Sequence, residues 1–390
     1  MGYDVLSPIG SLRRHVPVGS DYAEGALLLL RLTVVRIATH LCECACKVGF
    51  VVAPLKRSGD ASAQSMNHAF RVAHYRKIEA ERRTRVLLFV TGERAGLQTQ
   101  IAGDAIGPFV SLLDQIGPTK KLSLILDTNG GQTSAAWRLI NLIRSFGDEL
   151  EIIIPTKAMS AGTLMSLGAD RIVMTKQAAL GPIDPSLPNH PLAPLSINLV
   201  GQQQRVPVSA EAVRGYIDEV RKGIQDPAAL ASVWINLASQ VHPLVLGEIF
   251  RLGEQIRSLA RMLIGRQVVD ESKREQIIQL LCSDSGSHDY TINRRQATEM
   301  GLTIEKPSAE TYGILREIAG SFASELKTFE PYSLRSLLGA QTQAPYTLIR
   351  GLIESADESF GFVTEGLVAV DPAKGLDVVN QPTFDGWRKL

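Results

Sequence analysis

Short runs of apolar residues alternate with amphipathic segments between residues 86 and 175 of the chain. A short unbroken apolar run is typical of a strand that is buried on both faces of a parallel sheet. Such runs lie at residues 86–90, 122–126, 152–154 and 171–174. The segments 106–116, 135–146 and 160–169 place apolar or small residues at helical spacing. Strands that alternate with helices predict βαβ units and a mainly parallel sheet, so the fold class is α/β.

The pattern changes on both sides of this α/β region. Residues 1–75 form an N-terminal extension that we expect to be helical, with a polar helix at 68–83. After a loop at 185–207, helical patterns follow at 210–222, 227–238, 243–264 and 272–282, and another at 309–327 precedes an irregular tail. The predicted organisation is an N-terminal extension (1–75), a core with trailing helices (76–305) and a C-terminal helical extension and tail (306–390).

Composition narrows the class of protein. The 390 residues carry 41 Lys and Arg against 40 Asp and Glu, a formal net charge of +1, and 45% of them are hydrophobic. A nucleic-acid-binding domain usually shows a clear basic excess, and a disordered chain has too few apolar residues to form a core. We therefore expect a globular protein with no nucleic-acid partner.

The cysteines and the N-terminal apolar stretch indicate the compartment. Cys42, Cys44 and Cys46 are spaced by two, which differs from the gaps of a zinc site, and Cys282 stands apart. We predict no metal site and reduced thiols. The apolar stretch 27–35 is interrupted by an arginine and is far shorter than the roughly 20 residues that span a bilayer. A cytoplasmic location is expected, and membrane association is not favoured.

Three loops of the α/β region carry residues suited to acyl-transfer chemistry. The first is Thr128-Asn129-Gly130-Gly131, where paired glycines before a helix let backbone N–H groups face a developing oxyanion. In the second, Ser160 begins a helix among small residues, either as a nucleophile or as a simple N-cap. The third loop has the sequence Gly-Pro-Ile-Asp-Pro at 181–185. Each motif alone also fits an ordinary turn.

In this order, the three loops resemble the Clp-type peptidase and signal peptide peptidase A superfamily, and within it the serine dehydrogenase proteinase family. Further likeness lies in His242-Pro243-Leu244, in Arg251, in 256–257 and in 288–292. The resemblance covers residues 75–305. It implies the crotonase-like ββα spiral, with added helices at the N- and C-terminal sides.

The resemblance also implies an activity: a bacterial, ATP-independent serine peptidase that cleaves a peptide or protein substrate. It implies no cofactor and a homo-oligomer. Ser160 is then the nucleophile, and backbone N–H groups of Gly131 and Ala161 form the oxyanion hole. The family's Pro-Gly-Gly is Asn-Gly-Gly in this chain, which keeps both glycines.

The general base is not given by the resemblance, although a serine nucleophile requires one. Clp-type peptidases place a His on the loop after the next strand, where this chain has Asp184. Signal peptide peptidase A enzymes use a Lys, and the comparable stretch 206–210 contains none. His242 is our first candidate because it begins a long helix and imidazole is the side chain that most often serves as a general base, and Asp184 is placed to orient a base or a water. Weaker candidates are Lys176, Lys222, His190 and His288.

Two alternative functions stay open at this point. A crotonase-type acyl-transfer enzyme would use the same oxyanion hole without a serine nucleophile. A catalytically silent scaffold would lack a base within hydrogen-bond reach of Ser160. The serine at the start of a helix favours the peptidase.

Overall fold

A computed structural model describes residues 67–187, 190–197, 203–282, 290–371 and 377–390. The predicted N-terminal extension up to residue 66, with its three cysteines and its apolar stretch, lies outside the described residues, and so does His288. Everything that follows concerns the second of the chain's two units, Gln64–Leu390.

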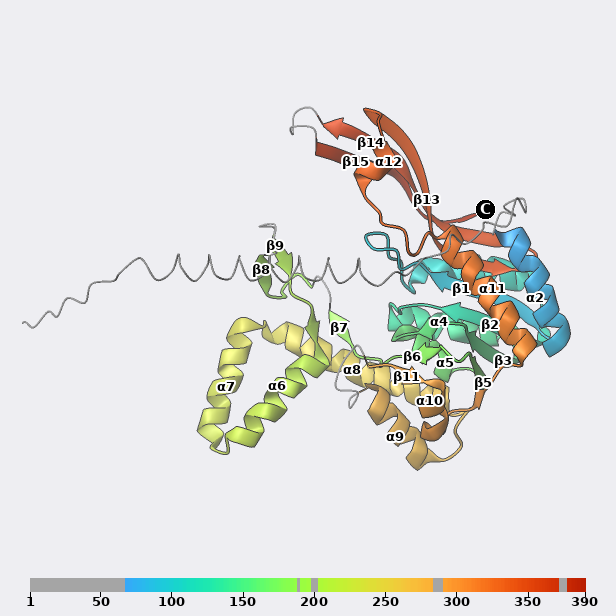
Figure 1. Cartoon of the computed structure of the whole chain (residues 1–390). Helices are drawn as coiled ribbons and strands as arrows, with labels where there is room; N and C mark the ends of the chain where they lie inside the picture. Colours follow the sequence, from blue (N-terminus) through green and yellow to red (C-terminus); the bar gives the residue numbers. More distant parts are fainter. Residues whose placement is uncertain (1–66, 188–189, 198–202, 283–289, 372–376) are drawn as a thin grey trace, which may run out of the picture. The chain divides into compact units, whose positions relative to one another are not determined.

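The second unit is built on one eight-stranded sheet (Figure 1). Its strands, in spatial order, are β12 (Ile304–Glu305), β5 (Arg171–Met174), β3 (Gly147–Ile154), β2 (Thr119–Asp127), β1 (Arg85–Thr91), β13 (Gln343–Ser355), β14 (Ser359–Asp371) and β15 (Asp377–Lys389). The strands from β12 to β1 are parallel, and β13, β14 and β15 continue the sheet in antiparallel pairs. The four apolar runs of the sequence therefore correspond to β1, β2, β3 and β5, whereas the short parallel strand β12 was not predicted.

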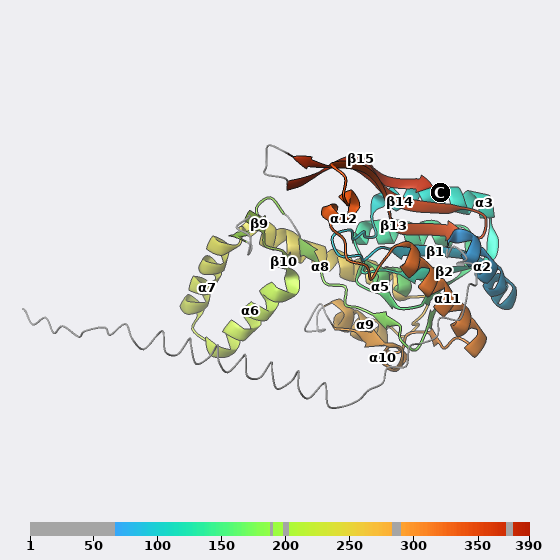
Figure 2. The ribbon, with the colours of Figure 1, turned by 45° about the horizontal axis from the view of Figure 1, so that its top comes forward.

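Alternating side chains of the parallel strands enter two separate cores, as the two-residue period of a strand requires. In β1, Leu87 and Phe89 belong to one core, whereas Val86, Leu88 and Val90 belong to the other. The first core lies under α3 (Ile106–Ile116), α4 (Thr133–Arg144) and α5 (Ala161–Leu167). The second lies under α2 (His68–Arg82) and α11 (Ala309–Glu325), which pack side by side (Figures 1 and 2). Helices thus cover both faces of the sheet.

A second, smaller layer of β structure follows the main strands. β3 leads into β4 (Lys157–Ala158), and β5 leads into β6 (Ala179–Leu180); both belong to a small sheet completed by β11 (Ile292–Asn293). Single bridges join Ile101 to Gly131 and Thr128 to Ala158, so the segment after β2 takes part in the same layer. Each turn of the chain is therefore a main strand, a short bridging segment and a helix. This is the crotonase-like ββα spiral that the sequence predicted.

The helices predicted after the core are present. They are α6 (Ala210–Gly223), α7 (Pro227–Gln240), α8 (Pro243–Ile264), α9 (Glu271–Cys282) and α10 (Arg294–Met300). Short strands precede them, β7 (Ser186–Leu187) paired with β10 (Val208–Ser209), and β8 (Leu195–Ile197) paired with β9 (Gln203–Arg205). α8 packs on α5 and α9, and its Ile256 and Leu263 enter the first core. This packing places α8 beside the helix that Ser160 begins.

The prediction of an irregular C-terminal tail is wrong. After the short helix α12 (Leu334–Leu338), the chain forms β13, β14 and β15, three strands of 13 residues each. Pro382 and several glycines weaken the local strand signal. Pro382 lies on the edge strand β15 next to a shift in register, which is where strands tolerate proline. The C-terminal segment therefore forms strands because it pairs with β1 in the folded protein, although its local propensity does not favour them.

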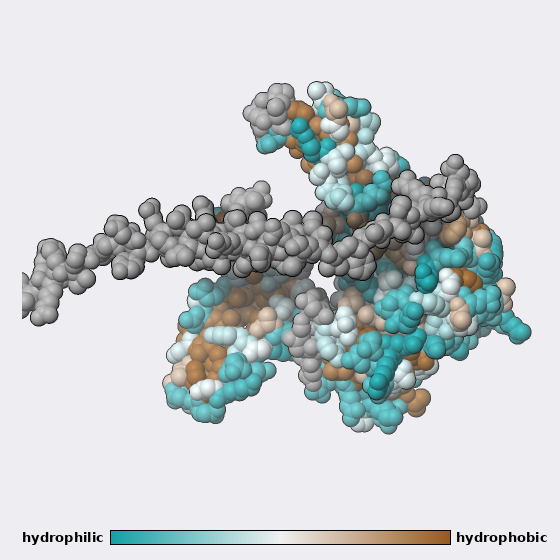
Figure 3. Space-filling view, in the orientation of Figure 1, coloured by the Kyte–Doolittle hydropathy of each residue, from teal (hydrophilic) through white to brown (hydrophobic). Residues whose placement is uncertain are grey.

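The helix α7 exposes an apolar surface. None of its residues is buried, Trp234 and Ile235 are exposed, and Pro227–Gln240 contains no charged side chain. Figure 3 shows apolar residues gathered over this helix. Among the described residues, no single helix is long and apolar enough to cross a membrane; α7 and α8 satisfy length and composition only as a pair bent by 98°.

Candidate active site

Ser160 has a backbone conformation that an ordinary N-cap serine does not adopt. An N-cap residue is normally extended, and its side chain accepts a bond from the first turn of the helix. Ser160 instead has φ 50° and ψ −113°, and its side chain caps nothing. Its hydroxyl makes no hydrogen bond to any described residue. A strained, unengaged serine at the start of a helix is typical of a functional position, so simple capping does not explain Ser160.

The loop before α5 is held from both ends. The Gly162 N–H donates to the Met159 carbonyl at 2.8 Å, which closes the tight turn around Ser160. The Thr163 hydroxyl lies within hydrogen-bond distance of the carbonyls of Ala158 (2.8 Å) and Gly181 (2.7 Å), which share its one proton, and it accepts from the Gly181 N–H. This buried threonine ties the serine loop to the loop that carries Asp184.

The Gly130-Gly131 turn fits against the serine loop with no space for a side chain. Both glycines have positive φ, 107° and 149°. A Cβ on Gly130 would lie 2.8 Å from Cβ of Ser160, and one on Gly131 would lie 2.3 Å from the carbonyl oxygen of Ile101. Both positions therefore require glycine, for the close approach as well as for the backbone conformation.

The N–H of Gly131 points away from the neighbouring segment at Ile101. Ile101 donates its N–H to the Gly130 carbonyl, and the Gln132 N–H donates to the Ile101 carbonyl, both at 2.8 Å. In such a bridge the intervening residue directs its own N–H to the opposite side. Within the described residues, the N–H groups of Gly131 and Ala161 donate no hydrogen bond. Two unengaged amides thus flank Ser160, as in an oxyanion hole.

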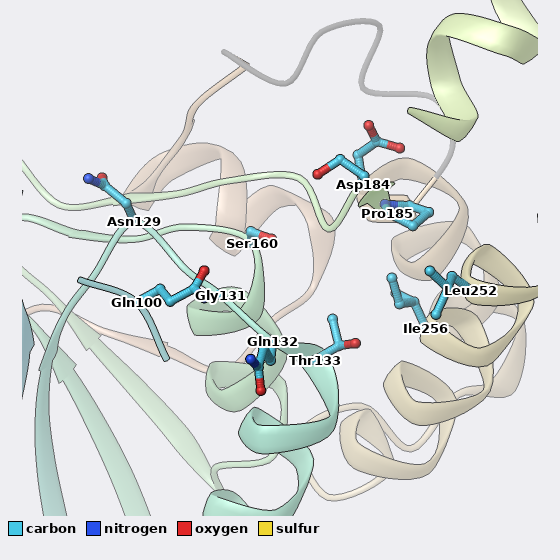
Figure 4. Close-up of a pocket in the computed structure, with 11 residues that line it drawn as sticks. Gln100, Asn129, Gly131, Gln132, Thr133, Ser160, Asp184, Pro185, Leu252 and Ile256 are labelled. Carbon is cyan, nitrogen blue, oxygen red and sulfur yellow. The ribbon is translucent and has the colours of Figure 1, made fainter. Parts of the chain in front are cut away.

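Ser160, Gly131 and Asp184 line one pocket of about 390 Å³ (Figure 4). The figure shows Ser160 between Gly131 and Asp184, with Leu252 and Ile256 of α8 forming a further wall. The remaining lining residues are Gln100, Asn129, Gln132, Thr133, Pro185 and Ser186. Of the described residues that line this pocket, Asp184 is the titratable one.

The structure does not bring His242 to this pocket. His242 is the exposed N-cap of α8, and its Nδ1 accepts the Leu244 N–H at 3.2 Å. Leu252, the nearest lining residue along α8, is ten residues farther on, about 15 Å at the rise of an α-helix. The remaining base candidates are also engaged elsewhere. His190 lies 3.2 Å from Glu248, Lys222 bonds Glu219, and Lys176 lies over the ring of Tyr312.

Asp127, which the sequence interpretation missed, is a buried carboxyl at the end of β2, one residue before the oxyanion turn. Burial raises the pKa of Asp127 to about 6, although the Thr156 hydroxyl donates to the carboxyl and Lys157 lies nearby. Lys157 itself pairs with Glu93. The signal was present in the sequence, since an Asp closing an apolar strand before Thr-Asn-Gly-Gly is unusual for a plain strand end.

No group of three His, Cys, Asp or Glu side chains that could hold a metal ion occurs among the described residues. Cys282 is buried, and burial raises the pKa of its thiol to about 12, so this thiol is inert at neutral pH. The pocket thus brings together a serine, a carboxylate and a glycine turn with an unbonded backbone amide on a crotonase-like fold, a set of groups that fits serine hydrolase chemistry.

Comparison with known proteins agrees with this class. Residues 62–226 match the family described as ClpP-like SDH-type serine proteinase, which confirms the resemblance predicted from the motifs. Two uncharacterized proteins of Methanocaldococcus jannaschii are similar to this chain. One is 27% identical over 224 residues (57% of this chain, 67% of the relative), and the other is 26% identical over 238 residues (59% and 69%). Both relatives are archaeal, so they give no support to a bacterial source.

The solved structures that are similar to this chain have low sequence identity to it. The 1510-N membrane-bound stomatin-specific protease in complex with a substrate peptide is 14% identical and covers 58% of this chain and 78% of its own, with a TM-score of 0.32. ClpP1 from Listeria monocytogenes is 13% identical over 60% of this chain and 98% of its own, with a TM-score of 0.32. A probable enoyl-CoA hydratase/isomerase from Mycobacterium abscessus is 13% identical over 61% and 73%, with a TM-score of 0.28.

Proposed function

We propose that this protein is a serine endopeptidase that hydrolyses peptide bonds without ATP and uses Ser160 as its nucleophile. The observation that carries the proposal is the position of Ser160. Its backbone is strained, its hydroxyl is unbonded among the described residues, and it lines a pocket together with Gly131. The family match over residues 62–226 supports a serine peptidase at the level of the class.

The reaction takes two steps. The Ser160 oxygen forms a bond to the scissile carbonyl carbon while its proton passes to a base, and the oxyanion accepts hydrogen bonds from the N–H groups of Gly131 and Ala161. The C–N bond then breaks, and the amine leaves with the proton. Water attacks the acyl-serine in the same oxyanion hole and releases the acid. Each oxyanion donor contributes about 10²–10³ in turnover in enzymes of this type.

Asp184 is our first choice for the group that receives the serine proton, directly or through one water. It lines the pocket of Ser160, and the described lining residues include neither His nor Lys. This choice changes the order of candidates set by the sequence, where His242 came first. His242 falls behind Asp184, because it caps the end of α8 that lies away from the pocket-lining Leu252 and Ile256.

The exposed apolar surface of α7 supports a homo-oligomer. Its exposed Trp234 and Ile235, and the absence of charge along Pro227–Gln240, suit contact with a second copy of the same neutral surface. Such self-contact is the arrangement expected of a symmetric oligomer.

A catalytically silent scaffold is the second candidate function. The observation that favours it is the same lining set, in which Asp184 is the titratable group among the described residues. A serine without a competent base would not be activated. The two functions differ in whether Ser160 reacts.

Labelling with a fluorophosphonate tests the proposal, because the activated serine oxygen displaces fluoride from phosphorus and forms a stable adduct. We expect one adduct per chain in the wild type and none in Ser160→Ala. Ser186→Ala is the matched control, since Ser186 lines the same pocket, and it should label like the wild type. A folded wild type that is never labelled, or labelling that persists in Ser160→Ala, would contradict the assignment.

A further inference from the structure

Thr128 contacts both loops that supply the two proposed oxyanion donors. Its hydroxyl accepts the Gly130 N–H at 3.0 Å, which fixes the Asn129–Gly130 peptide plane, one before the peptide that carries the Gly131 N–H. Its main chain bonds the serine loop twice: the Thr128 N–H donates to the Lys157 carbonyl (3.1 Å), and the Met159 N–H donates to the Thr128 carbonyl (3.0 Å). Thr128 is 1% exposed, so these bonds form away from water.

Two neighbours, Gly162 and Thr91, fix the rotamer of the Thr128 side chain. Its methyl group faces Gly162, where an added Cβ would lie 2.5 Å from Cγ2 of Thr128. Its hydroxyl lies 2.7 Å from the hydroxyl of Thr91, the last residue of β1, which is 5% exposed. The two threonine hydroxyls therefore form a buried chain that ends on the Gly130 amide.

We propose that Thr128, oriented by Thr91, is the positioning residue that sets the separation of the Gly131 and Ala161 amides. This inference rests on the proposed function of Ser160. The Gly131 N–H belongs to the peptide whose carbonyl is held by Ile101, and the preceding peptide is held by Thr128. With both planes fixed, the amide keeps one direction while the substrate changes from planar to tetrahedral. Thr128 touches no substrate atom and acts through the backbone.

Thr128→Val tests the role of the hydroxyl, because valine keeps the shape of the side chain but leaves the buried Gly130 N–H without an acceptor. A shift of the turn by about 1 Å is enough to cost on the order of 10²-fold in rate. We expect the maximal rate of fluorophosphonate labelling (kinact) to fall by about 10–100-fold. The half-saturating concentration (KI) should stay within about threefold of wild type, because the pocket walls are unchanged. Thr128→Ser restores the acceptor and should recover most of kinact.

Thr84→Val is the matched control. Thr84 precedes β1 at the end opposite Thr91, is 7% exposed, and its hydroxyl donates to the Lys121 carbonyl. The control should lose stability as Thr128→Val does but keep the wild-type kinact. If Thr128→Val fails to fold, Thr91→Val is used to test the inference instead. It removes the partner hydroxyl and should lower kinact by about 3–10-fold with unchanged KI.

Unchanged kinact in folded Thr128→Val, or a fall that Thr128→Ser does not reverse, would overturn the inference alone. An equal fall in Thr84→Val would also overturn it, because the effect would then be loss of stability. Absence of labelling in the wild type would overturn the proposed nucleophile and this inference together. Labelling of the wild type therefore distinguishes failure of this inference alone from failure of the proposed nucleophile.

Discussion

A methyl group at Gly130 would push the oxyanion turn away from the nucleophile. The Cβ of Gly130→Ala would lie 2.8 Å from the Met159 carbonyl oxygen, 2.8 Å from Cβ of Ser160 and 3.2 Å from the Ala161 nitrogen. Carbon atoms in ordinary contact lie about 3.5–4.0 Å apart, so the turn must move by about 0.7–1.2 Å. None of the three opposing atoms is the end of a flexible side chain, so the backbone has to give way.

The expected loss follows from that displacement. Moving a catalytic donor by about 1 Å costs on the order of 10²-fold, close to the effect of removing it. Alanine at φ 107° adds strain of about 1–3 kcal/mol, which lowers the melting temperature by about 1–4 °C in a unit of this size. Gly130→Ala should therefore remain folded at 25 °C while its fluorophosphonate labelling slows by about 10²-fold.

Intact-mass spectrometry at timed intervals measures this labelling rate, and circular dichroism of the same samples reports folding. Gly107→Ala, in α3, is the control because an added Cβ meets no atom within 4 Å. It should label at the wild-type rate and gain slightly in stability, since alanine favours a helix over glycine. Labelling of folded Gly130→Ala within about threefold of wild type would refute the geometry assigned to the oxyanion hole.

The remaining predictions concern the base, a buried carboxyl and assembly. Asp184→Ala should lower kinact by about 10²–10⁴-fold, and His242→Ala should leave it unchanged; the opposite pattern would assign the base to His242. Asp127 has its pKa raised from 3.8 to about 6 in the folded protein, so the folded state holds a proton that the unfolded chain releases. Stability should thus fall by about 3 kcal/mol in all as the pH rises from about 3 to about 7, most of it between the unfolded and the folded pKa, and urea unfolding of Asp127→Asn should lack this step. Parallel pH profiles would exclude the assignment. Ile235→Glu should shift the mass measured by light scattering toward that of the monomer. A wild type that is already monomeric would show that α7 does not form an interface between copies of the chain.

The sequence predicted the central part of the fold because a strand buried on both faces needs an unbroken apolar run. The run at 86–90 became β1, and its alternate side chains fill two cores as a parallel strand requires. β15 gave no such signal. Its exposed edge position admits Asp, Asn and Pro, and its pairing with β14 is fixed by tertiary contacts rather than by local preference.

The sequence could predict the part of the candidate site that lies in loops at the ends of neighbouring strands. Gly131 and Ser160 follow successive strands of a parallel sheet, so their proximity is a consequence of the topology. The bridge from Ile101 and the hydrogen-bonded hydroxyls of Thr91 and Thr128 could not be predicted, because they depend on side-chain and backbone directions that the spacing of residues in the sequence does not give. The position of His242 likewise depends on the direction in which α8 leaves the core.

Hydrolysis of peptides by the protein itself tests the central claim most directly. A library of internally quenched peptides is incubated with the wild type and with Ser160→Ala, both without nucleotide. The masses of the products are then measured by mass spectrometry. The account predicts cleavage by the wild type into fragments whose masses add up to the peptide plus one water, and no cleavage by Ser160→Ala. Equal cleavage by both proteins, or none by a folded, oligomeric wild type across the library, would contradict it.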